Sequence, residues 1–285
     1  MAVRRFTCIA LTGVLGALIV GSASAKTPKT VALSVSITGS GSVRVGSHVV
    51  SCAGTACHQT IRVQRSSTVV IRTTPAARWK FTTWAGACKG SEATCSLQLR
   101  TDSAVGVSFV PPGARSNPYP LGTAVTLVGG WRVTINSDRI NADEQVEAVR
   151  DDSGLQVNDP PPAGAQYTLV NLSVTYVGPG SNGFEDYLFG ALKAEGADKI
   201  LYEPTCTPPQ PVGSIDPLLS GRTDSGNLCY EIASVDATSL LLTGFAAATG
   251  ARTAHYPFTR PVWFALRQPP SKEPGLQERR GAEPA

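Results

Sequence analysis

Short runs of alternating apolar and polar residues, rich in β-branched side chains, recur along this chain of 285 residues. Such alternation turns one side of an extended strand toward a core and the other toward water. Helical periodicity is nearly absent, and residues 141–150 fit a short helix or a polar edge strand equally well. The pattern predicts an all-β fold. Strands are expected at residues 31–37, 43–45, 61–63, 68–73, 105–109 and 167–176, with a hairpin connection at residues 39–42.

The first 25 residues have the pattern of an export signal. Arg4 and Arg5 precede an apolar run at residues 6–20, and small residues follow at positions 21–25. This order predicts a secretory signal peptide that is cleaved after Ala25. The run is shorter than the roughly 20 apolar residues that span a bilayer. We therefore expect a secreted protein that can associate with the cell wall and has no transmembrane anchor after cleavage.

Six cysteines remain once the signal peptide is removed, and they fall into sequence-local pairs. Export to an oxidising compartment favours disulfides. The first four could instead form a metal site, but their spacings are wider than those of a tight zinc knuckle. The expected disulfides are Cys52 with Cys57, Cys88 with Cys95, and Cys206 with Cys229.

A proline-rich segment divides the mature chain. Pro111, Pro112, Pro118 and Pro120 remove backbone donors and interrupt any continuing strand. The expected organisation is a signal peptide at 1–25, a basic domain at 26–113, a linker at 114–120, a second domain spanning 117–268 and a disordered tail at 269–285.

An aromatic segment marks the first domain. Residues 74–90 contain Trp79, Phe81 and Trp84 before a cysteine, and a Val-x-Val-x-Phe strand closes the domain at residues 105–109. Residues 31–110 resemble the bacterial repeat of the divergent internalin-B B-repeat type, which implies a small β-module of exported surface proteins without catalytic residues. Strand alternation places Trp79 and Phe81 on one face and Trp84 on the other. The three aromatics are expected in the core, with an exposed sugar-stacking platform as the alternative.

The second domain carries its own set of motifs, at residues 117–122, 130–135, 158–170, 173–178, 226–232 and 239–242. In this order they resemble the telokin-like immunoglobulin-fold domain of unknown function that is common in secreted proteins of high-GC Gram-positive bacteria. The resemblance implies an immunoglobulin-like β-sandwich and says little about activity. We expect Trp131, Tyr167, Leu169 and Trp263 to fill its core.

Signatures of catalysis and metal binding are missing from the sequence. It has no nucleophile elbow, zinc-protease helix, phosphate loop or dinucleotide fingerprint. Copper-binding relatives of the telokin-like fold raise a metal role, but the mature chain has no methionine and three dispersed histidines, His48, His58 and His255. Acidic residues at 143–152 could hold calcium, although a solvated face fits them better. We expect no cofactor, metal or catalytic residue; a hydrolase with paired carboxylates stays as an alternative.

Charge differs between the two expected domains. Residues 26–113 contain ten Lys and Arg against two acidic residues, a net charge of +8; residues 116–268 contain nine against sixteen, a net of −7. The difference could simply aid solubility or could draw the domains together. It also fits a non-catalytic binding or adhesion protein of the cell envelope that holds an anionic polymer, without specific nucleic-acid recognition. Candidate contacts are Arg62, Arg65, Arg72, Arg78, Lys80 and Lys89; the alternative function is an extracellular structural or interaction module with a protein partner.

Overall fold

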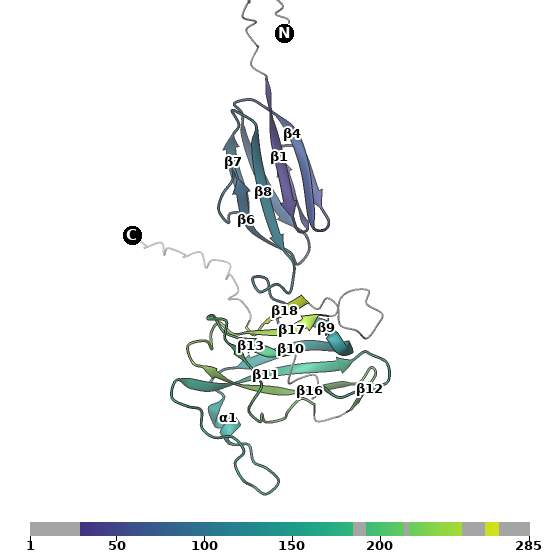
Figure 1. Ribbon diagram of the computed structural model, residues 1–285, viewed down its shortest axis with the longest axis vertical. Helices are drawn as coiled ribbons and strands as arrows, with labels where there is room; N and C mark the ends of the chain where they lie inside the picture. Colours follow the sequence, from purple (N-terminus) through teal and green to yellow (C-terminus); the bar gives the residue numbers. More distant parts are fainter. Residues whose placement is uncertain (1–28, 185–191, 214–216, 247–259, 268–285) are drawn as a thin grey trace, which may run out of the picture.

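The computed structural model describes residues 29–184, 192–213, 217–246 and 260–267, so the expected signal peptide and tail lie outside the described residues. Two hydrophobic clusters form separate cores, one from residues 31–109 and the other from residues 125–266 (Figure 1). We call the surrounding structures the first and the second β-unit. Nearly all regular structure is strand, which confirms the all-β prediction.

The first β-unit is a sandwich of two four-stranded sheets. One sheet has the order β4-β1-β8-β6, with β1 and β8 parallel, and the other has the order β3-β2-β5-β7. Alternate residues of both sheets meet in one core. The strands are β1 (Thr30–Thr38), β2 (Gly41–Val45), β3 (His48–Cys52), β4 (Ala56–Gln64), β5 (Thr68–Pro75), β6 (Lys80–Gly86), β7 (Thr94–Gln98) and β8 (Ser103–Val110).

The connection at residues 39–42 is a crossover between the two sheets, so the predicted hairpin is wrong. β1 pairs with β4 and β8, whereas β2 pairs with β3 and β5. Gly39 has a φ of +88°, and a Cβ there would lie 2.3 Å from the carbonyl oxygen of Phe109. Glycine accommodates this backbone conformation in a hairpin or in a crossover, so the glycine does not distinguish the two connections. The packing of the two sheets over one core selects the crossover.

The aromatic segment of the first β-unit belongs to its core, as expected, but its predicted faces are wrong. β6 has a bulge between Phe81 and Thr83, which inserts one residue into the alternation. The rings of Phe81 and Trp84 therefore meet, 5.5 Å apart and edge to face. Trp84 is buried and its Nε1 donates to the Glu92 carbonyl oxygen at 2.6 Å, while Trp79 packs at the border of the core.

In the second β-unit, one sheet curls around its core. Its order is β14-β13-β17-β9-β10-β11-β16, with β18 paired to β17. Residues of β17 and β18 pack in the same cluster as residues of β11 and β16. The elements are β9 (Ala124–Leu127), the 3-10 helix η1 (Val128–Gly130), β10 (Trp131–Arg139), α1 (Asp143–Glu147), β11 (Ala165–Tyr176), β12 (Ser181–Asn182), β13 (Lys193–Glu195), β14 (Leu201–Tyr202), β15 (Leu218–Leu219), β16 (Thr223–Ala233), β17 (Leu241–Ala246) and β18 (Arg260–Ala265). β12 and β15 form a separate pair.

The core of the second β-unit is built around Trp131. Its side chain is fully buried, as predicted, and the rings of Tyr176 and Phe184 both lie 5.0 Å from it. Tyr167 and Leu169 were expected in this core, but they point to the opposite face of β11 and join a smaller cluster with the Cys206–Cys229 disulfide. Residues 166–170 of β11 are buried on both faces, which alternation alone does not reveal.

Trp263 is the third exception to the predicted core. It is half-buried, and the guanidinium of Arg115 lies 5.7 Å from its ring centroid. Arg115 belongs to the Pro-rich segment, where it also donates from Nε to Glu195 at 2.7 Å. Trp263 therefore contacts the linker, through Arg115, on the surface of the second β-unit.

The Pro-rich segment is hydrogen-bonded to both β-units. Asn117 Nδ2 donates to the Arg78 carbonyl oxygen at 2.9 Å, on the side of the first unit. Tyr119 N donates to the Trp263 carbonyl oxygen at 2.8 Å, on the side of the second. These contacts fix both ends of the connection seen in Figure 1.

All three expected disulfides are present.

The segment at 141–150 contains the short helix α1, so of the two predicted alternatives the helix is correct and the edge strand is not. Among the described residues, no helix is long and apolar enough to cross a membrane.

Candidate functional site

The six basic residues predicted as polymer contacts are spread over the first β-unit. Arg62 projects from the outer face of the β4-β1-β8-β6 sheet, and Arg72 from the outer face of the β3-β2-β5-β7 sheet. Arg65 follows β4, and Lys89 lies exposed in the loop between β6 and β7. The structure therefore divides the predicted set between two faces and the loops.

Two members of the set lie beside the linker. Lys80 Nζ donates to the Ser116 carbonyl oxygen at 3.1 Å, and the Arg78 backbone accepts the hydrogen bond from Asn117. Lys80 thus has a structural contact, whereas the side chains of Arg62 and Arg72 have none within the described part of the chain.

Arg72 has a basic neighbour that the sequence prediction missed. Arg44 of β2 is its direct partner in the antiparallel register. Both side chains are exposed, and the residues on either side of each arginine turn toward the core. Directly opposite side chains have Cβ atoms about 5 Å apart, and like charges there are destabilising. Within the described residues, no carboxylate forms an ion pair with either guanidinium.

The neighbours of the arginine pair on the adjacent described strands are uncharged. Ser42 and Thr74 form the next outward-facing pair of these strands. Val49, the β3 partner of Arg44, is 47% exposed, and Val70 of β5 is 44% exposed. We call the outward-facing residues Ser42, Arg44, Val49, Val70, Arg72 and Thr74 the arginine face. Its signal was present in the sequence, because Arg44 interrupts an apolar strand in the same way as Arg72 does.

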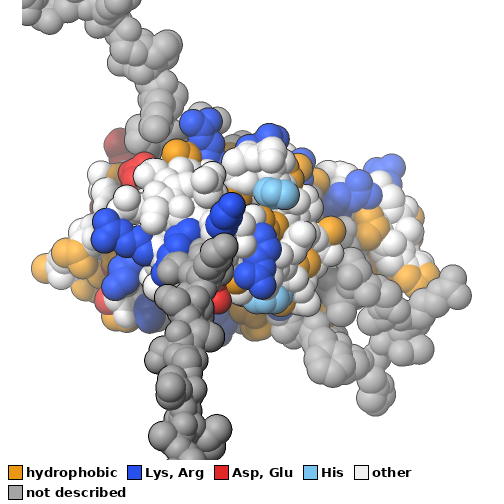
Figure 2. All heavy atoms as spheres, turned by 90° about the horizontal axis from the view of Figure 1, so that it is seen from above, with side chains coloured by type: hydrophobic (Ala, Val, Ile, Leu, Met, Phe, Trp, Pro, Cys, Tyr) orange, Lys and Arg blue, Asp and Glu red, His pale blue; other side chains and the backbone are white. Residues whose placement is uncertain are grey.

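Basic side chains also predominate on the wider surface of the first β-unit. Figure 2 looks down on the end of the molecule that carries this unit, and Lys and Arg side chains are scattered over it among few acidic ones. In the part of the chain that the structure describes, no ion pair joins residues 29–110 to residues 121–267. The Lys and Arg side chains of the first β-unit are therefore not neutralised by direct ion pairs with the second β-unit among the described residues.

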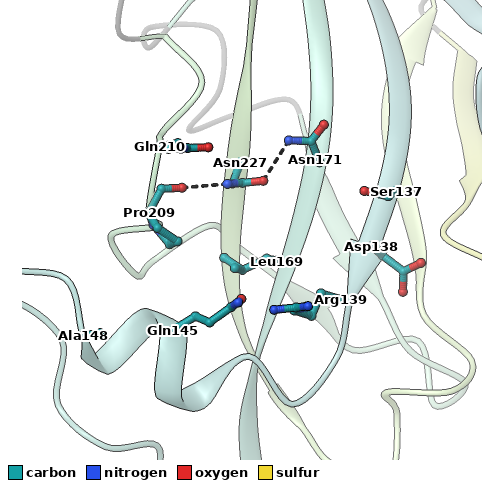
Figure 3. A pocket seen from close by; sticks show the side chains of 10 residues that line it. All are labelled: Ser137, Asp138, Arg139, Gln145, Ala148, Leu169, Asn171, Pro209, Gln210 and Asn227. Carbon is teal, nitrogen blue, oxygen red and sulfur yellow. Dashed lines mark hydrogen bonds between the residues drawn. The ribbon is translucent and has the colours of Figure 1, made fainter.

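The second β-unit has a polar pocket on the outer face of its sheet. The cavity has a volume of about 550 Å³ and lies between β10, β11 and β16, with α1 and the loop at residues 209–210 as walls (Figure 3). This volume is within the range of small-molecule sites, but such sites usually have a more apolar lining. The lining residues are Ser137, Asp138, Arg139, Gln145, Ala148, Leu169, Asn171, Pro209, Gln210 and Asn227.

The floor of the pocket is one end of a ladder of identical side chains. Residues 171–175 read Asn-x-Ser-x-Thr, residues 223–227 read Thr-x-Ser-x-Asn, and antiparallel pairing places like opposite like. Asn171 Nδ2 donates to Asn227 Oδ1 at 2.9 Å, and Asn227 Nδ2 donates to the Pro209 carbonyl oxygen at 2.6 Å (Figure 3). The serine and threonine hydroxyls also pair, each at 2.8 Å. These mutual bonds fix the amide orientations before any ligand enters.

A small buried cluster holds the walls in place. The Cys206–Cys229 disulfide ties the loop to β16. The buried Asn158 donates from Nδ2 to the carbonyl oxygens of Val146 in α1 and Thr207 in the loop, both at 2.9 Å. Helix and loop are therefore braced against the sheet, and the pocket is preformed.

The charged groups of the pocket point in different directions. Asp138 turns away from the cavity (Figure 3), toward Arg267, whose Nε lies 3.4 Å from Oδ2. Burial raises the pKa of the Asp138 carboxyl, and Arg267 opposes this shift. Arg139 and Gln145 extend toward one another at the wall (Figure 3). Neither side chain has a hydrogen-bond partner among the described residues, so both are available to a ligand.

The other residues considered from the sequence stay dispersed. His58 Nδ1 lies 3.0 Å from Ser36 Oγ, His48 is exposed at the start of β3, and His255 lies outside the described residues. In the acidic stretch, Asp143 accepts from the Tyr167 backbone, and Asp151 accepts from Ser153 and Leu155. The described residues contain no group of three or more His, Cys, Asp or Glu side chains placed to hold a metal ion.

Fold and sites together define a disulfide-containing all-β protein with a basic face and a separate polar pocket. No protein-family model matches the chain, and no curated protein matches it. Among solved structures, an uncharacterized β-sandwich protein from Clostridium difficile 630 is similar over 53% of this chain and 95% of its own length, with 13% identity and a TM-score of 0.34. That likeness is too remote to transfer a residue role, so both family resemblances stay predictions.

Proposed function

We propose that this chain is a non-catalytic extracellular binding protein that attaches to an anionic polymer of the cell envelope through the arginine face. The observation that carries this proposal is the directly opposed pair Arg44 and Arg72, which lacks a carboxylate partner within the described residues. An arginine fork matches phosphate and carboxylate oxygens in two-point geometry. A polymer with repeated negative charges would relieve the repulsion between the two guanidinium groups.

An oxidising location supports the proposal. Three disulfides, each between sequence-local cysteines, are typical of exported proteins. The predicted signal peptide at residues 1–25 points to the same compartment. Outside the cell, wall phosphodiesters and acidic glycans are the polyanions that such a face meets.

The test is co-sedimentation of the mature protein with purified cell envelope, and with poly(glycerol phosphate) immobilised on beads, across a salt series. Binding is expected to weaken as salt rises, because charge pairs at a surface are screened. A basic residue contributes about 1 kcal/mol at an anionic surface, so R44Q/R72Q should weaken binding roughly 30-fold at low salt.

The matched control is R62Q/R65Q, which removes the same charge from elsewhere on the first β-unit. It is expected to weaken binding far less than R44Q/R72Q. Equal effects of the two double variants would show that overall charge, and not the arginine face, is responsible. Binding that persists in high salt would reject the proposal in favour of a protein partner.

A further inference from the structure

We infer that the polar pocket of the second β-unit binds an uncharged saccharide unit, a site separate from the arginine face. The pocket offers amides, a hydroxyl, a guanidinium and three apolar side chains on one preformed surface. Asn and Gln amides and the arginine fork each have two polar atoms at fixed spacing, which suits neighbouring hydroxyls of a sugar ring. Leu169 and Pro209 provide apolar surface for the C–H groups of the same ring.

The electrostatics of the second β-unit favour a neutral ligand. Asp138 is engaged with Arg267, so Arg139 is the charged lining side chain that faces the cavity (Figure 3). One arginine in a domain with a net charge of −7 over residues 116–268 is a poor receptor for a polyanion. As a hydrogen-bond donor to sugar oxygens, the same arginine needs no charged partner.

Other ligand classes fit the pocket less well. Its lining contains no aromatic side chain on which a nucleobase could stack. A peptide could add as a strand to the β16 edge, but the chain already occupies that edge near the pocket. Asn227 N donates to the Gln210 carbonyl oxygen at 2.9 Å, and Val212 N donates to the Asn227 carbonyl oxygen at 3.2 Å. The pocket therefore fits best a compact ligand that can form hydrogen bonds in several directions.

The experiment is saturation-transfer NMR on the mature full chain, with calorimetry on any sugar that responds. The probes are gluco-, manno-, galacto- and N-acetylglucosamine oligosaccharides in 0.5 M NaCl. At this salt concentration the proposed polymer binding is screened, whereas hydrogen bonding to a neutral sugar persists. At least one oligosaccharide is expected to bind, and R44Q/R72Q should bind it equally well.

Variants of exposed lining residues locate the site. Arg139→Ala and Gln145→Ala remove exposed side chains without a partner among the described residues, so the fold should be retained. Each is expected to weaken sugar binding roughly tenfold, the effect of one hydrogen bond. The control, Arg132→Ala, removes an exposed arginine of β10 outside the pocket. The inference would be overturned if every oligosaccharide failed to bind, or if Arg139→Ala and Gln145→Ala left sugar binding unchanged. Neither outcome bears on the arginine face, which the co-sedimentation experiment tests separately.

Discussion

At the scale of single residues, the two arginines proposed to bind the polymer also lower the stability of the first β-unit. Arg44 and Arg72 are direct cross-strand neighbours with like charge. Such a pair costs up to about 1 kcal/mol relative to neutral neighbours. Functional residues often lower the stability of a fold, and this trade-off fits a binding role for the pair.

Replacing Arg72 with threonine should therefore stabilise the first β-unit. Threonine suits an exposed strand position and leaves Arg44 without a charged opponent. The expected gain is about 0.5 kcal/mol in unfolding free energy at low salt, shrinking as salt screens the repulsion. Urea unfolding of the wild type and of Arg72→Thr measures it. Arg62→Thr is the control, because Arg62 lies opposite Ala32. A gain of the same size in the control would contradict the explanation.

Tyr202 gives a prediction about alkaline pH. Its hydroxyl donates to Asp236 Oδ2 at 2.7 Å, and burial together with this bond raises the pKa of Tyr202 from 10.0 to about 12. Between these values the unfolded chain loses the proton and the folded chain keeps it, so the contribution of Tyr202 to stability falls as pH rises from 10 to 12.

Tyr202→Phe should remove this contribution. At pH 8 the variant is expected to be less stable by about 1–2 kcal/mol, because Oδ2 of the buried Asp236 loses its donor, while Oδ1 still accepts from Ala197 N. The gap between wild type and variant should narrow from pH 10 to pH 12. Urea midpoints at pH 8, 10 and 12 measure the gap, and a gap independent of pH would contradict the assignment.

At the scale of elements, the Cys206–Cys229 disulfide has a larger role than the two shorter ones. It closes the longest disulfide loop, with a sequence separation of 23, and it lies in the cluster behind the polar pocket. The chain-entropy relation gives about 3 kcal/mol for a loop of this length and about 2 kcal/mol for the Cys52–Cys57 loop.

C206S/C229S should accordingly destabilise the second β-unit by about 3 kcal/mol and loosen the pocket wall. Calorimetry measures the stability, and hydrogen exchange of the backbone amides of Thr207, Gln210 and Val212 measures the loosening, since the other residues of 207–212 are prolines. C52S/C57S serves as the control, since it is expected to destabilise the first β-unit and to leave exchange at 207–212 unchanged. Loss of protection there in the control would show that the two β-units unfold together.

At the scale of the whole molecule, Arg115 connects the linker to the second β-unit. It forms an ion pair with Glu195, donates from Nη2 to the Gly196 carbonyl oxygen at 2.9 Å and packs on Trp263. Glu195 is nearly buried, with 9% of its side chain exposed, so loss of its partner is costlier than at an open surface.

Arg115→Ala should free the linker and lower the unfolding free energy of the second β-unit by about 1–2 kcal/mol. Small-angle scattering is expected to show a larger radius of gyration, because the two β-units then sample more orientations. Arg115→Lys keeps the charge but loses the planar fork, so it should recover the scattering curve in part. An unchanged radius in Arg115→Ala would mean that the backbone bonds of Asn117 and Tyr119 hold the linker without it.

Local features of the sequence were enough for part of this structure. Alternation identified the strands at residues 31–37, 68–73 and 167–176, and cysteine spacing identified all three disulfides. Alternation and cysteine spacing are both local in the sequence. They can therefore be interpreted without knowing which strands become neighbours.

The tertiary structure decided the partners and therefore the sites. Arg44 lies opposite Arg72, and Asn171 opposite Asn227, because distant strands meet in one register. The crossover at Gly39 and the bulge at Phe81 likewise follow from closing two sheets over one core. Each strand buries one face whichever neighbour it receives, and non-local packing selects the neighbour. For this reason the sequence by itself determined the strands and disulfides of this protein, whereas only the folded chain assembled the arginine face and the polar pocket.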